Sequence, residues 1–258
     1  MDTVAYAKEY LDLMKVVHGN GNVLNVSTIT LICNLNVERI CMQTFCERFD
    51  EKGIEMKRYK RNKDFEITKR GKIKKSFFNQ VTLNYSDISK KSIKVFSNGK
   101  LQITGLTSCL ECNKVSDMVN GWLKKYLQED ICITKMYIGM INSNFSIMTN
   151  LDLVKLNGLL NLVPNVISIY NPESYPAINM KYIAPEISVS VFIFATGNIV
   201  ITGGKKLWDM RVAYEFIHDI VTKHMNIVGK KSEQPSKTVR AEPYVCGYPI
   251  RQCMSCTV

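Results

Sequence analysis

Apolar positions along this chain change their period several times, and each change predicts a new element. Residues 3–17 carry apolar side chains at steps of three and four, which predicts a helix that ends before Gly19. Residues 23–35 are rich in β-branched side chains, as strands are, and residues 37–49 return to helical spacing. A further strand is predicted over residues 77–85.

The clearest pattern is one that occurs twice. Residues 93–105 read IKVFSNGKLQITG, and residues 191–203 read VFIFATGNIVITG. An internal repeat of this kind indicates two copies of one structural unit, and we expect them to be related by a pseudo-twofold axis. The positions that are identical at one constant offset are Phe96, Gly99, Ile103, Thr104 and Gly105, which match Phe194, Gly197, Ile201, Thr202 and Gly203.

Each copy predicts a β-hairpin followed by an amphipathic helix. Short apolar runs flank a turn at residues 97–99 and again at residues 195–197, and Asn98-Gly99 tolerates the positive φ angles of a tight turn. After each Thr-Gly pair, residues 115–126 and 213–224 place apolar side chains on one helical face. We expect each helix to pack on one side of its sheet.

These patterns divide the chain into four parts. They are an N-terminal helix (1–22), a first repeat (23–130), a second repeat (131–228) and a flexible, cysteine-containing tail (229–258). Within the first repeat, residues 51–75 are strongly basic. This insertion is predicted to be a solvated hairpin or loop, and the alternative is that it contacts phosphates.

Composition narrows the possible partners. The chain has 258 residues, of which 46% are hydrophobic and 22% are charged, and these fractions are typical of a globular protein. Its formal net charge is +11. This charge favours an anionic partner such as nucleic acid, although plain solubility also explains it. The N-terminus lacks the apolar core of a signal peptide, and the most apolar stretch, 187–201, is interrupted and too short to span a membrane. We therefore expect a protein that is not secreted and has no membrane partner.

Cysteine pairs raise the question of a metal. Cys109 and Cys112 have zinc-ligand spacing, but their counterparts in the second copy are apolar, which favours buried thiols. In the tail, Cys246, Cys253 and Cys256 leave zinc open as an alternative, although no fourth ligand is evident. We expect no metal, no cofactor and no enzymatic activity, because no glycine-rich phosphate loop or nucleophile motif occurs.

The repeated Phe-x-x-Gly-x-φ-x-φ-Thr-Gly motif, in which φ is apolar, resembles the TATA-binding protein family. Residues 170–178, YNPESYPAI, are similar to the YEPELFPGL segment of that family's second repeat, and Pro185 also falls where the family has proline. The resemblance covers about residues 23–225, and divergent members of this kind are known from large DNA viruses. It implies an α+β fold, a saddle in which two pseudo-symmetric repeats form a curved antiparallel sheet with helices on the convex face.

The resemblance also implies a mode of DNA binding. The family contacts the minor groove of A·T-rich DNA and inserts aromatic side chains between base steps, which kinks the duplex. The wedge positions match Phe78, Phe96, Tyr175 and Phe194. The groove and phosphate positions match Asn25, Val26, Lys100, Gln102, Thr104, Ile138, Lys181, Val200 and Thr202.

Several positions depart from the family pattern. The family has a base-contacting asparagine on the first strand of each repeat, whereas Asn25 lies one residue from that position and the second copy has Met136. The counterparts of the two basic positions, Asn198 and Asn84, are neutral. Because these changes remove base and phosphate contacts that the resemblance implies, they argue against a strong preference for the TATA sequence.

The resemblance therefore predicts a transcription initiation factor that binds and bends A·T-rich promoter DNA. Such a factor recruits a IIB-type transcription factor and the RNA polymerase machinery, in the nucleus or, for a viral protein, in a cytoplasmic virus factory. The main alternative is an interaction module that keeps the fold and has lost specific TATA binding. A third class, an accessory domain of a nucleic-acid enzyme, lacks a visible catalytic set.

Overall fold

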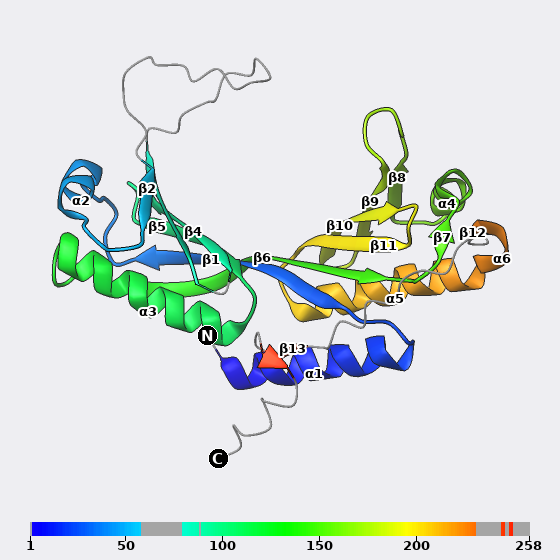
Figure 1. The fold of residues 1–258 in the computed structure, drawn as a ribbon, viewed down its shortest axis with the longest axis horizontal. Coiled ribbons are helices and arrows are strands. Elements are labelled where there is room, and N and C mark those ends of the chain that lie inside the picture. Colours follow the sequence, from blue (N-terminus) through cyan, green and yellow to red (C-terminus); the bar gives the residue numbers. More distant parts are fainter. Residues whose placement is uncertain (1, 58–78, 88, 231–243, 246–247, 250–258) are drawn as a thin grey trace. The chain divides into compact units, whose positions relative to one another are not determined.

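The fold is given by a computed structural model, which describes residues 2–57, 79–87, 89–230, 244–245 and 248–249 (Figure 1). Most of the basic insertion, Phe78 and the tail cysteines lie outside the described residues. Two of the tail's short segments, β13 (Tyr244–Val245) and β14 (Tyr248–Pro249), pair with each other.

The chain forms two compact units that do not coincide with the two predicted repeats. The first unit contains residues 30–106 and 111–137, and the second contains residues 2–29, 107–110 and the described residues from 138 onward. The N-terminal helix therefore belongs to the same unit as the second repeat. The division into repeats at residue 131 stays a prediction.

The first unit combines a sheet with two helices. Its strands lie in the order β2-β3-β4-β5-β1, and neighbouring strands from β2 to β5 are antiparallel. The elements are β1 (Asn25–Leu35), which begins in the second unit, α2 (Met42–Arg48), β2 (Glu55–Lys57), β3 (Gln80–Ser86), β4 (Lys90–Phe96), β5 (Lys100–Leu106) and α3 (Cys109–Tyr126).

The second unit repeats this plan. Its strand order is β6-β11-β10-β9-β8, with antiparallel neighbours throughout. The elements are α1 (Thr3–Gly19), β6 (Ile133–Ser146), β7 (Asn150–Leu151), α4 (Leu153–Leu160), β8 (Val166–Ile169), β9 (Ala177–Ala184), β10 (Ile187–Phe194), β11 (Asn198–Gly204), α5 (Leu207–Lys223), α6 (Met225–Val228) and β12 (Gly229–Lys230).

The two hairpins of the sequence repeat have the same register. In the first, Ile93 pairs with Ile103 and Ser92 with Thr104. In the second, Val191 pairs with Ile201 and Ser190 with Thr202. Because both hairpins use the same spacing, equivalent side chains lie on equivalent faces. The predicted α+β class and the duplicated hairpin and helix are confirmed.

The structure differs from the predicted elements at three places. Helix α2 begins at Met42 and not at residue 37, because residues 37–41 run past the β4–β5 turn, where the Ile40 amide donates to the Ser97 carbonyl. Within the predicted insertion, Glu55–Lys57 form the strand β2, which pairs with β3. At the other end, β12 pairs with β7, so the tail begins with an ordered pairing.

Glycine is required at the hairpin turns by close backbone contact. Gly99 has a φ of 72°, and a Cβ atom there would lie 1.9 Å from the Val37 carbonyl oxygen. Gly197 has a φ of 79°, and its Cβ would lie 2.3 Å from the Thr149 carbonyl oxygen. Asn98 does not adopt positive φ, so only the glycine of the predicted Asn-Gly pair uses the left-handed region.

We expect Gly99→Ala to lower the free energy of unfolding by at least about 2 kcal/mol, because it adds both a left-handed alanine and a backbone clash. Gly158→Ala is a matched control, since Gly158 lies in α4 with no atom within 4 Å of its added Cβ. That change should raise stability by about 0.5–1 kcal/mol through helix propensity. Urea denaturation followed by circular dichroism measures both. Equal stabilities for the two variants would contradict this account of the turn.

Helix α1 is part of the second unit's core. Asp2 caps it by accepting hydrogen bonds from the Val4 and Ala5 amides, and the apolar face formed by Leu13 and Val17 is buried. The side-chain amide of Asn22 donates a 2.9 Å hydrogen bond to the hydroxyl of Tyr214, a fully buried residue of α5. The N-terminal helix is therefore attached to the second unit by both packing and a buried polar contact.

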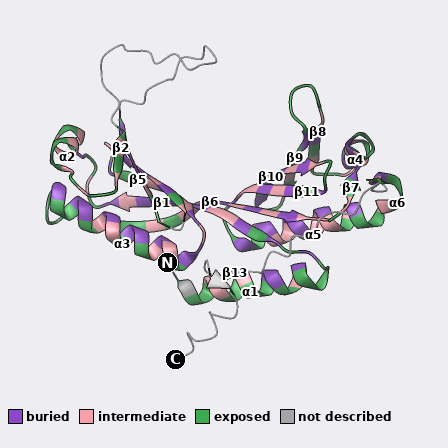
Figure 2. Cartoon of the chain, viewed as in Figure 1, coloured by how far each residue is buried: buried purple, intermediate pink, exposed green. Residues whose placement is uncertain are grey.

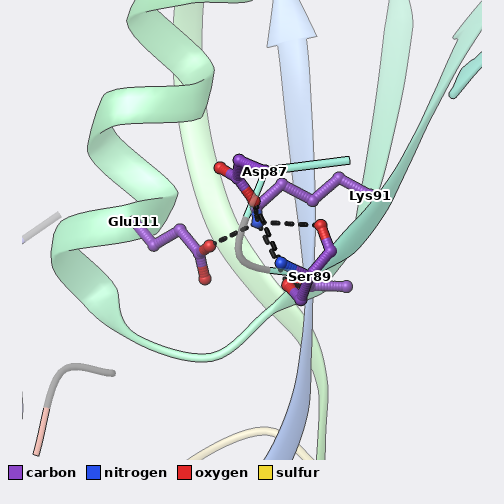
Figure 3. Close-up of polar contacts among 5 residues, drawn as sticks. Asp87, Ser89, Lys91 and Glu111 are labelled. Carbon is purple, nitrogen blue, oxygen red and sulfur yellow. Dashed lines mark hydrogen bonds and ion pairs between the residues drawn. The ribbon is translucent and has the colours of Figure 1, made fainter. Parts of the chain in front are cut away.

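The first unit contains a buried cation at a position where the second unit has valine (Figure 3). The Lys91 side chain is 0% exposed, and its ammonium contacts the carboxylates of Asp87 and Glu111, the latter at 2.7 Å. It also donates to the Ser89 hydroxyl at 3.1 Å. The register-equivalent residue in the second unit is the buried Val189. This cluster ties the β3–β4 turn to the first turns of α3.

Candidate nucleic-acid interface

Each unit has a sheet face on which its long helix does not pack. Figure 1 shows α5 along one side of its strands, and Figure 2 shows buried and less buried positions alternating along them. On β10 and β11, Val191 and Ile201 are buried on the face that α5 covers. The alternate residues are half-buried and lie on the opposite face; they include Phe192, Phe194 and Val200. This helix-free face is the candidate interface.

The helix-free face of the second unit carries an aromatic cluster. The Tyr175 ring lies 5.8 Å from that of Phe192 and 6.2 Å from that of Phe194, measured between centroids. Tyr175 is 46% exposed, in the segment between β8 and β9. The structure thus brings together the two predicted wedge residues, Tyr175 and Phe194. Phe192 was not predicted as a contact residue, although its position two residues before Phe194 places it on the same face.

Hydroxyl and amide groups form a polar row beside these rings. The Thr202 hydroxyl donates a 2.6 Å hydrogen bond to the Asn142 side-chain oxygen on β6. The Asn142 amide in turn lies 3.4 Å from the Thr28 hydroxyl on β1. Thr202 was predicted, whereas Asn142 and Thr28 were not. Strand alternation in the sequence indicates on which face each of these side chains lies. Only the pairing of β6 with β11 shows that Thr202 and Asn142 are neighbours.

The first unit places its predicted residues on the equivalent face. Phe96, Gln102 and Thr104 are half-buried and alternate with the buried Leu101 and Ile103. The Thr104 hydroxyl donates to the Ser92 carbonyl at 3.3 Å and not to a side chain. Phe78, the other wedge residue predicted for this repeat, lies outside the described residues.

The two faces differ in charge at equivalent positions. Lys94 in the first unit occupies the place of Phe192 in the second, since each pairs with the equivalent residue of the next strand, Gln102 or Val200. The predicted phosphate contacts Lys100 and Lys181 are exposed, as such a role requires. The first face is therefore more basic and the second more aromatic.

The predicted contact residues on β1 and β6, the first strands of the two repeats, differ in their exposure. Asn25 is exposed and Ile138 is half-buried, so both have accessible atoms. Val26, by contrast, is only 5% exposed. Its predicted role as a groove contact is not supported by this structure, because little of the side chain reaches the surface. Burial in β1 changes phase between Val26 and Ile29, which simple alternation does not predict.

Other candidate chemistry is limited. Cys109 and Cys112 are both buried, and burial raises the pKa of the Cys109 thiol, so they have the character of structural thiols. Among the described residues, no group of three or more histidine, cysteine or acidic side chains is placed to hold a metal ion. The tail cysteines, for which zinc was an alternative, lie outside that set. Within the described part of the chain, no helix is long and apolar enough to cross a membrane.

The fold and this face define a two-repeat α+β protein with one helix-free sheet face per repeat. Residues 137–224 match the family model described as transcription factor TFIID, or TATA-binding protein. Among solved structures, the chain is similar to Methanococcus jannaschii TBP, with a TM-score of 0.56 and 18% identity over 78% of this chain and 98% of that one. The likeness shows that the fold is the expected TBP-like fold.

Sequence relatives agree with the structural match. The chain is 29% identical to a TATA-box-binding protein-like protein of Acanthamoeba polyphaga mimivirus, over 85% of this chain and 70% of that protein. It is 30% identical to TATA-box-binding protein C of Halobacterium salinarum, over 50% of this chain and 69% of that protein. Its match to the TATA-box-binding protein of Sulfolobus acidocaldarius spans 60% of that protein, at 31% identity.

The chain therefore belongs to the TATA-binding protein family. It is a divergent member of the kind that large DNA viruses encode, as its similarity to the mimivirus protein indicates. Membership in this family associates the chain with transcription. The expectation that it is not an enzyme stays a prediction.

Proposed function

We propose that this protein binds A·T-rich double-stranded DNA through the minor groove, bends it, and thereby serves transcription initiation. The observation that carries the proposal is the pair of helix-free faces, which have the same strand register. Each face has a phenylalanine beside the hairpin turn, Phe96 or Phe194. Each also has a threonine on the second strand of the hairpin, Thr104 or Thr202. Side chains of this kind fit a groove that offers few distinguishing polar groups.

The chemistry of the faces suits a kinked minor groove. Unstacking a base step costs a few kcal/mol, and apolar wedges offset this cost by burying surface against the opened step. Tyr175, Phe192 and Phe194 supply such a surface in the second unit. The threonine hydroxyls and the Asn142 amide supply small polar groups that reach base edges without adding charge.

The proposed partners follow from the family. They are an A·T-rich promoter, a IIB-type transcription factor and the RNA polymerase machinery, acting in the nucleus or in a viral cytoplasmic factory. The second candidate is an interaction module of the transcription apparatus that keeps the fold and lacks specific TATA binding. The changes at Met136, Asn198 and Asn84 favour this alternative, because they remove base and phosphate contacts that the resemblance implies.

The test is the affinity for two duplexes of equal length, one with a TATA sequence and one with G·C substitutions, measured by fluorescence anisotropy across a salt series. We expect at least tenfold tighter binding to the TATA duplex. Each phosphate contact contributes about −0.9 to the slope of log K against log salt, so the few lysines on these faces predict a slope of roughly −3 to −4. Equal affinities with a slope near −10 would overturn minor-groove recognition.

A further inference from the structure

We draw no further inference here: the strongest candidate, the surface patch on α5 where the Arg211 guanidinium lies over the exposed ring of Trp208, carries nothing because no residue in the described part of the chain shows what covers it.

Discussion

Replacing Phe194 by alanine is expected to weaken binding of an A·T-rich duplex by roughly 30–150-fold, or about 2–3 kcal/mol, and to reduce the bend. The Phe194 ring lies on the helix-free face beside Tyr175, and in the proposed function it is the wedge that would hold a base step open. A straighter duplex then buries less of the sheet surface, which lowers the affinity. Anisotropy gives the affinity, and energy transfer between dyes at the duplex ends reports the bend.

A matched control separates the wedge from a general loss of aromatic surface. Trp208 is an exposed aromatic residue on α5, the helix that packs on the other face of the same sheet. Trp208→Ala should leave both affinity and bending unchanged. The equivalent change at Phe96 tests the first repeat, and the double variant Phe96→Ala/Phe194→Ala should bind DNA without bending it. Unchanged bending in the double variant would remove both residues from the wedge assignment.

Replacing Lys91 by methionine is expected to have the largest effect on stability, lowering the free energy of unfolding by about 3 kcal/mol. Methionine keeps most of the side-chain volume but removes the ammonium that contacts the Glu111 carboxylate at 2.7 Å (Figure 3). Breaking one partner of a buried ion pair costs more than the pair contributes, because the other charge stays desolvated. Urea denaturation measures the change.

Two further variants make this prediction specific. Glu111→Gln combined with Lys91→Met removes the Glu111 charge together with the cation that faces it, and should recover more than half of the lost stability. Lys15→Met breaks an exposed ion pair with Asp12, at 3.4 Å, and should change stability by about 0.5 kcal/mol or less. If Lys91→Met is no more destabilising than Lys15→Met, the buried cluster does not stabilise the first unit.

The same cluster predicts how stability depends on pH. Burial of the Asp87 carboxyl acts to raise its pKa, but the hydrogen bonds from Lys91 and the Ser89 amide outweigh it, so the pKa is lowered. Burial likewise acts to lower the pKa of Lys91, and the bonds to Asp87 and Glu111 raise it overall. The Asp87 contribution is therefore present above its ordinary pKa of 3.8 and lost below it, and the Lys91 contribution is present below 10.5 and lost above it.

The sequence by itself determined the duplicated hairpin, its helix and the faces on which their side chains lie. The matched pairs Ile93–Ile103 and Val191–Ile201 follow from identical spacing, because side chains in a strand alternate with a fixed period of two. The positions of Phe96 and Phe194 on the helix-free face follow from the same rule. The family resemblance rests on these local patterns, which the amino-acid sequence alone contains.

Only the tertiary structure decided which distant residues meet. Asn142 joins Thr202 because β6 pairs with β11, and Asn22 reaches Tyr214 because α1 packs on α5. Lys91 alternates with the buried Ile93 and Val95, so strand periodicity places it on the inner face, but its ion-pair partners come from a turn and from a separate helix. Each of these contacts depends on the pairing of elements far apart in the chain, and periodicity within one element carries no information about that pairing.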